Sequence, residues 1–220
     1  MNTAKTKRMS TQTMVLGAVL TALVVILQFM GAFIRFGPFS ISLVLIPIVI
    51  GAATCGVAIG AWLGFIFGIV VLISGDAAAF MAINVPGTIV TVLLKGILCG
   101  LCAGLVYKYV TSALNKRSAK QMARIGVCGD CEPKVLAYIS RNNKYIAVLA
   151  AAIVCPVVNT GIFLVGCFVF FLDTVASWAG EAHVIYYMIF GLVGGNFLFE
   201  VASNLLLSPV VVRLLNIRKK

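Results

Sequence analysis

The stretch FGPFSISLVLIPIVIGAATCGVAIGAWLGFIFGIVVLISG, residues 36–75, decides the fold class because it contains no charged residue. An α-helix needs about 20 apolar residues to cross the hydrocarbon core of a bilayer. Residues 36–75 are too many for one crossing and suit two crossings joined by a tight turn. Glycine favours such turns. The region between Gly51 and Gly56 is therefore the predicted turn, with spans over 40–56 and 57–75.

The remainder of the chain has the same character. Of its 220 residues, 62% are hydrophobic and only 10% are charged, whereas a soluble domain carries about 25% charged residues. So few charges cannot cover a surface that faces water, which leaves lipid as the solvent. The other apolar runs predict spans over 13–34, 84–109, 145–172 and 184–207, with a basic loop at 111–143. We therefore expect an all-α membrane protein, a six-helix bundle that forms one domain over residues 1–220.

The distribution of charge predicts the topology. The N-terminal tail, the 111–143 region with its flanks and the C-terminal tail hold all but two of the 17 Lys and Arg residues. Cytoplasmic loops carry this excess of basic residues, so both termini are predicted to face the cytoplasm. The loops on the other side keep Arg35 with a few acidic residues, among them Asp76. Because the basic residues follow the topology and form no groove-binding patch, nucleic acid is not an expected partner despite the net charge of +11.

Glycine recurs at every fourth position in three of the predicted spans. Lipid provides no hydrophobic drive for helices to associate, so small residues that permit close backbone contact are typical of helix interfaces. We expect these glycines to pack helices together: Gly60, Gly64 and Gly68 in the third span, Gly96, Gly100 and Gly104 in the fourth, and Gly191 and Gly195 in the sixth.

Polar residues form stripes on single faces of the last three spans. Residues three, four or seven apart lie on one side of a helix. Lys95 lies about 16 Å below Asn84 by the helical rise, near the midplane, where an unpaired ammonium costs at least about 2.5–3.5 kcal/mol. The stripes are Asn84, Thr88, Thr91 and Lys95 in the fourth span, Asn159 and Thr160 in the fifth, and Asn196, Glu200 and Asn204 in the sixth.

Two interpretations of these stripes stay open. The structural one is a buried Lys95–Glu200 pair supported by amide hydrogen bonds between helices. The functional one is a ligand pocket reached from outside, or a path for ions. We favour the pocket because ionisable residues inside a membrane mark functional sites by default.

The residues needed for catalysis or metal binding are scarce. His183 is the only histidine, so neither a Ser–His pair within the membrane nor a multi-histidine metal site can form. Cys128 and Cys131 make a single C-x-x-C pair with no second pair to complete a zinc site. The G-x-x-x-x-G-K-[ST] motif of ATPases is absent from the sequence. We expect no enzymatic activity, cofactor or metal, and any uphill transport would draw energy from an ion gradient or a partner.

Two short motifs carry a family resemblance. Ala18 and Ala22 form an A-x-x-x-A pattern in the first span, and ISLVLIPIVIG, residues 41–51, precedes the glycine-rich third span. Together with the six spans and two inside termini, these features resemble the substrate-binding S component of energy-coupling factor (ECF) vitamin transporters. The stretch 41–51 is similar to the group that carries riboflavin, pantothenate and folate.

The resemblance implies a function in a bacterial cell membrane. An S component binds a vitamin from outside and docks on a T component, here through Ala18 and Ala22, and two ATPase subunits drive release inside. The implied pocket lies in the outer loops and the outer halves of the last three helices. The matching positions are Asn84, Thr88, Lys95, Asn159, Asn196 and Glu200, with Arg35 and Trp178 in loops that could cover the pocket.

The substrate and two rival functions stay open at this point. Lys95 and Arg35 suit the carboxylate of pantothenate, whereas aromatic residues such as Trp62 and Phe163 suit the rings of riboflavin. Folate and a thiamine precursor rank behind these two. The first rival is a stand-alone secondary transporter that uses Lys95 and Glu200 as proton-coupling groups. The second is a membrane scaffold subunit without a small ligand.

Overall fold

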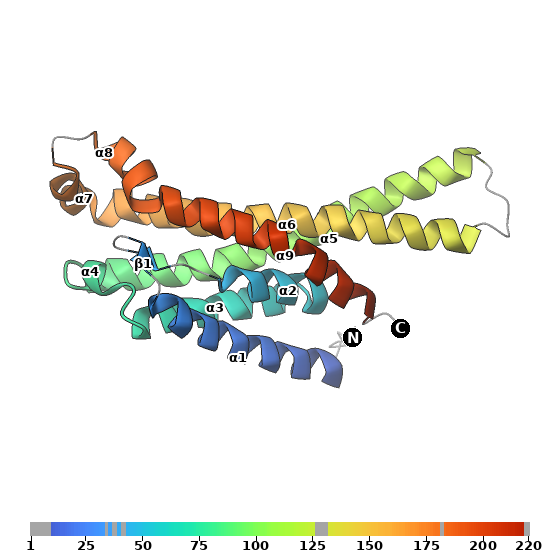
Figure 1. The fold of residues 1–220 in the computed structure, drawn as a ribbon, viewed down its shortest axis with the longest axis horizontal. Helices are drawn as coiled ribbons and strands as arrows, with labels where there is room; N and C mark the ends of the chain where they lie inside the picture. The colour runs from blue at the N-terminus through green and yellow to red at the C-terminus, as the bar shows by residue number, and fades with distance from the viewer. Residues whose placement is uncertain are drawn as a thin grey trace, which may run out of the picture.

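The computed structural model describes residues 10–33, 35–36, 39–40, 43–125, 132–180 and 183–217. Within them the chain is almost entirely helical, and a two-residue antiparallel hairpin pairs Arg35 with Ser40 (Figure 1). The elements are α1 Thr11–Phe33, β1 Arg35–Phe36, β2 Phe39–Ser40, α2 Leu45–Cys55, α3 Val57–Ile73, α4 Ala78–Met81, α5 Val85–Ile125, α6 Glu132–Phe170, α7 Leu172–Ala179, α8 Val184–Tyr186, the π-helix η1 Tyr187–Gly194 and α9 Gly195–Ile217.

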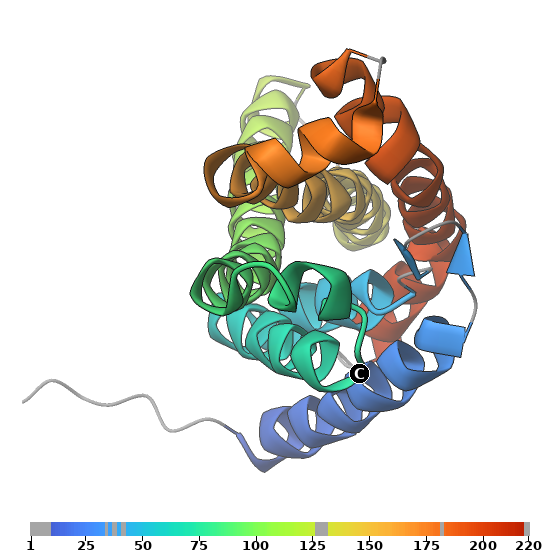
Figure 2. The ribbon, with the colours of Figure 1, turned by 90° about the vertical axis from the view of Figure 1, so that its left-hand side faces the viewer.

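The bundle has two distinct ends. The short elements β1, α4, α7 and α8 gather at one end, which we call the capped end (Figure 1). The first turn of α1 and the last turn of α9 lie toward the opposite end. Seen from the capped end, α2 lies among the long helices (Figure 2) and contacts α1, α3, α5, α6 and α9. Its apolar sequence is thus explained by contact with five neighbouring helices, which bury most of its residues.

The number of membrane-length helices differs from the predicted six. Within the described residues, four helical segments are long and apolar enough to cross a bilayer: 11–31, 85–122, 137–170 and 184–216. The predicted spans 40–56 and 57–75 correspond to α2 and α3, which have 11 and 17 residues. They separate at Gly56, within the predicted turn region, where φ is 100°. At about 16 Å, α2 is too short to cross the hydrocarbon core by itself.

The glycines of α3 and α5 bring these two helices into backbone contact. A Cβ added to Gly64 would lie 1.9 Å from the carbonyl oxygen of Gly96, and one added to Gly100 would lie 2.0 Å from that of Gly60. Only glycine permits so close an approach. The predicted role of these glycines in helix packing is confirmed for α3 and α5.

The glycines of the last helix behave differently from the prediction. A Cβ at Gly195 would meet none of the described atoms within 4 Å, and one at Gly191 would meet Tyr187, four residues earlier in the same helix. The prediction that they pack against another helix is therefore wrong. Gly191 instead lies within η1, where the chain adopts wider π-helical turns.

The basic region 111–143, predicted as a loop, is mostly helical. The helix α5 has 41 residues, about 62 Å, and continues to Ile125, while α6 begins at Glu132. The two helices project together beyond the rest of the bundle (Figure 1). Asn143 stabilises this projection because its Nδ2 donates to Asn115 Oδ1 at 3.0 Å and to Ser118 Oγ at 3.1 Å. Cys128 and Cys131 lie outside the described residues.

Candidate functional site

A cavity of about 790 Å³, including its open mouth, lies among the helices. Its walls combine aromatic rings with hydroxyl, amide and charged groups. The lining residues come from α1, α3, α4, α5, α6, η1, α9 and the turn before α4: Gln28, Phe67, Val71, Asp76, Ala77, Phe80, Thr88, Thr91, Val92, Lys95, Asn159, Thr160, Phe163, Cys167, Phe171, Leu192, Val193, Asn196 and Glu200.

The start of α5 positions three polar residues on the cavity wall. Asn84 precedes the helix, and its Oδ1 accepts a hydrogen bond from the Gly87 N–H at 3.0 Å. Such a side-chain bond is typical of an N-cap residue. Thr88, Thr91 and Lys95 follow at helical spacing and line the cavity. Asn84 does not line it, so its observed role is to begin the helix.

Lys95 points between two aromatic rings. Its Nζ lies 5.3 Å from the ring centre of Phe163 on α6 and 5.7 Å from that of Phe67 on α3. A ring face attracts a cation at such distances, the more so when water is excluded. The carboxylates of Glu200 and Asp76 line the same cavity as Lys95. The Lys95 amino group thus lies between two aromatic rings on the wall of the cavity.

The wall formed by α9 contains a hydrogen-bonded amide and carboxylate. Asn196 Nδ2 donates to Glu200 Oε1 at 3.0 Å, one turn along the same helix. Glu200 is 1% exposed. Elsewhere in the cavity wall, Gln28 Nε2 of α1 donates to Asp76 Oδ2. Each carboxylate that lines the cavity therefore accepts a hydrogen bond from a neighbouring amide.

Three buried oxygen atoms in the cavity wall have no hydrogen-bond partner among the described residues. They are Thr91 Oγ1, Asn159 Oδ1 and Asn196 Oδ1. Thr91 and Asn159 are each only 5% exposed. A buried acceptor without a donor costs about 1–3 kcal/mol, and such groups are rare in native structures unless something else satisfies them. Their concentration around one cavity indicates that a ligand or water supplies the missing donors.

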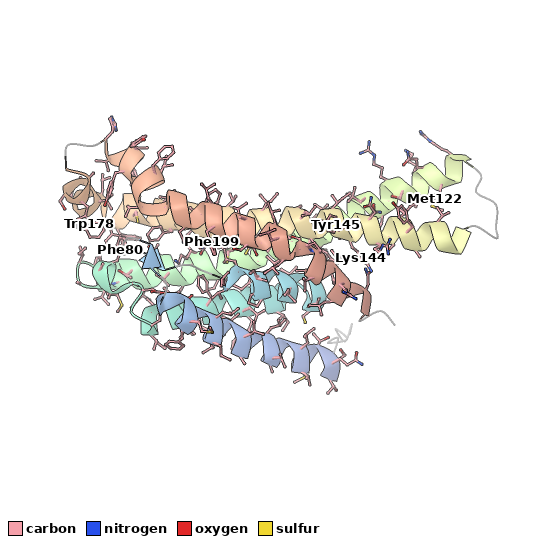
Figure 3. The ribbon with its side chains drawn as sticks, in the orientation of Figure 1. Phe80, Met122, Lys144, Tyr145, Trp178 and Phe199 are labelled. Carbon is pink, nitrogen blue, oxygen red and sulfur yellow. The ribbon has the colours of Figure 1, made fainter. Side chains whose placement is uncertain are left out.

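Five of the eight predicted substrate-binding residues meet at this cavity. Trp178 of α7 does not line it but packs edge-on against Phe80, with ring centres 5.6 Å apart (Figure 3). The side chain of Arg35 lies outside the described residues. Of the aromatic candidates, Phe163 lines the cavity, whereas Trp62 is half exposed on α3. The five residues at the cavity are Thr88, Lys95, Asn159, Asn196 and Glu200, and their contact with a substrate stays a prediction.

Sequence reasoning missed Gln28 and Asp76. Asp76 lies in the turn between α3 and α4, as the sequence predicts for a loop residue, and also lines the cavity beside the Gln28 amide, 48 positions earlier in the chain. Gln28 is almost completely buried within an otherwise apolar helix. A lone amide in such a helix costs free energy unless it has a partner. The position of Gln28 within an apolar run could therefore have identified it as a candidate site residue.

The fold and the cavity define a multi-pass helical membrane protein with a small-molecule site among its helices. The model of the ECF transporter substrate-specific component family matches residues 12–212, nearly the whole chain. The chain therefore belongs to this family of substrate-specific components of ECF transporters. Proteins of the family are substrate-binding subunits of transmembrane transporters, and they work with a T component and ATPases. No protein of curated function matches the chain.

Proposed function

We propose that this protein captures a vitamin-sized molecule in the cavity between α3, α5, α6 and α9 and delivers it to a T component and two ATPase subunits. The observation that carries this proposal is the set of buried oxygens of Thr91, Asn159 and Asn196 around one cavity, which have no hydrogen-bond partner in the part of the chain that the structure describes. A scaffold subunit without a ligand would gain nothing from leaving these groups unsatisfied. Glu200 and Lys95 contribute charge to the same site.

Pantothenate and riboflavin are the substrates that the sequence favours. The aromatic wall formed by Phe67, Phe80, Phe163 and Phe171 suits a planar ring, because offset and edge-on ring contacts are favourable. Among the described wall residues, Lys95 is the one cationic side chain that suits a carboxylate group of a ligand. The wall also contains the carboxylates of Asp76 and Glu200, which do not favour such a group. Riboflavin therefore fits this wall better than pantothenate does.

The proposed arrangement has six crossings with both termini in the cytoplasm of a bacterial cell membrane. In it, α2 and the residues before it complete the second crossing, and α3 makes the third, close against α5. The capped end then faces outside, where a vitamin would enter, and the basic projection of α5 and α6 faces the cytoplasm. The positive-inside rule supports this orientation because residues 1–8 and 213–220 are also rich in Lys and Arg.

Ala18 and Ala22 are the proposed docking residues for the T component. The opposite face of α1, with Leu20 and Val24, is buried in the bundle, so Ala18 and Ala22 are exposed on the outward face. Small exposed residues on a membrane helix permit close approach of a second helix. This placement is compatible with docking of a membrane-embedded partner.

The experiment that tests this proposal is uptake into proteoliposomes. We expect the purified chain alone to bind ligand without accumulating it, and ATP-dependent uptake to require the T component and both ATPases. Uptake by the chain alone that a protonophore abolishes would overturn the proposal in favour of an ion-coupled transporter. Absence of binding to the folded chain would instead favour a scaffold.

A further inference from the structure

The projecting part of α5 carries positive charge along one side. Four basic side chains are exposed there, and we call them the basic face: Lys116, Arg117, Lys120 and Arg124. With 3.6 residues per turn, these positions lie within about 100° of one another around the helix axis. The basic face therefore forms a single stripe, about 12 Å long, near the C-terminal end of α5.

The basic face points away from the neighbouring helix α6. Asn143 of α6 donates hydrogen bonds to the side chains of Asn115 and Ser118 on α5. By the helical rotation, Asn115 and Ser118 lie on the side of α5 opposite to the middle of the basic face. The contact between the two helices thus orients the basic face outward from the projecting pair (Figure 1).

Acidic residues that could neutralise the basic face are scarce in the same helices. The sequence of α5 contains none, and that of α6 contains only Glu132. Lys116 and Lys120 are one turn apart, as are Lys120 and Arg124, and like charges at this spacing destabilise a helix. The helix dipole favours a cation in the last turn and so accounts for Arg124 alone. A partner of opposite charge would remove the repulsion along the stripe.

The positive-inside rule explains why this segment is basic but not why its charges share one side. The rule depends on the number of Lys and Arg residues in a cytoplasmic segment and not on the direction of their side chains. On α6, the guanidinium carbon of Arg141 lies 5.8 Å from the ring centre of Tyr138, which is 65% exposed. Arginine and tyrosine are both enriched in protein–protein interfaces. The projection therefore has the composition of an interaction surface.

Lipid headgroups lie too far from the outer part of the basic face to be its partner. Lys120 lies about 52 Å and Arg124 about 58 Å along the helix axis from Val85, where α5 begins. A bilayer is about 40–45 Å thick including its headgroups. With α5 along the membrane normal, Lys120 thus lies at least about 7 Å beyond the bilayer and Arg124 at least about 13 Å. Attraction between exposed charges is largely screened beyond about 8 Å at physiological ionic strength, whereas a cytoplasmic protein can contact the whole stripe.

From the one-sided charge, the scarcity of acidic residues and the reach of α5, we infer that the basic face docks on an acidic protein surface at the cytoplasmic side of the T component and its ATPases. This inference rests on the proposed function, which supplies the orientation and the partner. It adds a second contact to the proposed one through α1. Ala18 and Ala22 meet the partner within the membrane, and the basic face meets it in the cytoplasm, where complementary charge speeds encounter and fixes orientation.

The test measures equilibrium association of the purified full chain with the complex of T component and two ATPases in a neutral detergent. One variant, Lys120→Gln with Arg124→Gln, removes two charges from the basic face. The control, Lys108→Gln with Arg213→Gln, removes two charges from exposed positions outside it. We expect the first variant to associate at least about tenfold more weakly and with less dependence on salt, and the control to stay within about twofold of the wild type. Unchanged vitamin binding and melting temperature establish that each variant is folded.

The outcomes separate this inference from the function on which it rests. Equal association of the wild type and the Lys120→Gln, Arg124→Gln variant would overturn the inference and leave the proposed function intact. An equal loss in the control would also overturn it, because total charge and not the basic face would then determine association. A loss that appears only after anionic phosphatidylglycerol is added would assign the basic face to the membrane surface instead. Failure of the wild-type chain to associate would count against both the inference and the proposed function.

Discussion

Replacement of Gly64 by alanine tests the close backbone contact between α3 and α5. The new Cβ would lie 1.9 Å from the carbonyl oxygen of Gly96 and 2.7 Å from its carbonyl carbon, where ordinary contact begins at 3.4 Å. Both atoms belong to a helix backbone, so no side chain can rotate away. The helices must move apart by more than an ångström, which also loosens the neighbouring contact between Gly60 and Gly100.

The size of the effect follows from two opposing contributions. Overpacking costs about 1–3 kcal/mol, and the backbone location at Gly64 favours the upper end. Replacing glycine by alanine within a helix also raises the free energy of unfolding by about 1 kcal/mol, because alanine has the higher helix propensity. We therefore expect Gly64→Ala to lower the free energy of unfolding by about 2 kcal/mol, which lowers the melting temperature by about 4–8 °C for a chain of this length.

The assay is thermal unfolding in detergent with Gly161→Ala as the matched control. Gly161 lies in α6, and a Cβ there would meet none of the described atoms within 4 Å. The control should melt at the wild-type temperature or slightly above it, because it gains helix propensity without a clash. Equal melting temperatures for the two variants would refute the close contact between α3 and α5.

Three further predictions concern other parts of the molecule. Ala18→Trp should leave ligand affinity unchanged but abolish ATP-driven uptake with the partner subunits. The control Val165→Trp, at an exposed position of α6, should permit uptake, and uptake with both variants would contradict docking through α1. Asn143→Ala removes the donor to two side chains on α5 and should lower the local stability of the projection by about 1–2 kcal/mol. This loss should appear as faster amide hydrogen exchange in the projecting parts of α5 and α6, with no change in ligand affinity. Unchanged exchange would show that these bonds do not stabilise the projection. Trp178→Ala removes an edge-on contact worth about 1 kcal/mol between α7 and Phe80, which lines the cavity. If α7 covers the site through this contact, ligand dissociation measured by stopped-flow fluorescence should become several-fold faster. An unaltered rate would exclude a covering role for α7.

Periodic features of the sequence predicted the parts of the structure that depend on helix geometry alone. The spacing of Gly60, Gly64 and Gly68 indicated a packing face before any partner was known, and the structure supplies α5 as the partner. The polar stripes of the last three spans likewise converge on one cavity, because residues three or four apart share a face in any α-helix. Hydropathy alone could not show that α2 is an interior helix of 11 residues, since a buried helix and a lipid-facing one are both apolar.

Features that depend on contacts between distant residues were not predictable in this way. The pairing of Gln28 with Asp76 joins α1 to the turn before α4, and no local pattern marks it. Asn84 was assigned to the pocket because it continues the stripe of α5, but its side chain caps that helix instead. Its place directly before an apolar helix with Pro86 in the first turn was a readable cap signal. The Asn84 side chain therefore caps the helix and does not extend the polar stripe to the cavity wall.

The central claim is that the cavity binds a small molecule through the buried oxygens of its wall. The most direct test is a thermal-shift titration of the purified chain against B vitamins and their precursors, with the wild type and Asn159→Ala measured side by side. At a ligand concentration about 100 times the dissociation constant, binding should stabilise the fold by about 2.7 kcal/mol, or about 5–10 °C. The account predicts one ligand that gives this saturable shift with the wild type and a much smaller one with Asn159→Ala. A folded wild-type protein that no ligand stabilises, or equal shifts in both proteins, would contradict it.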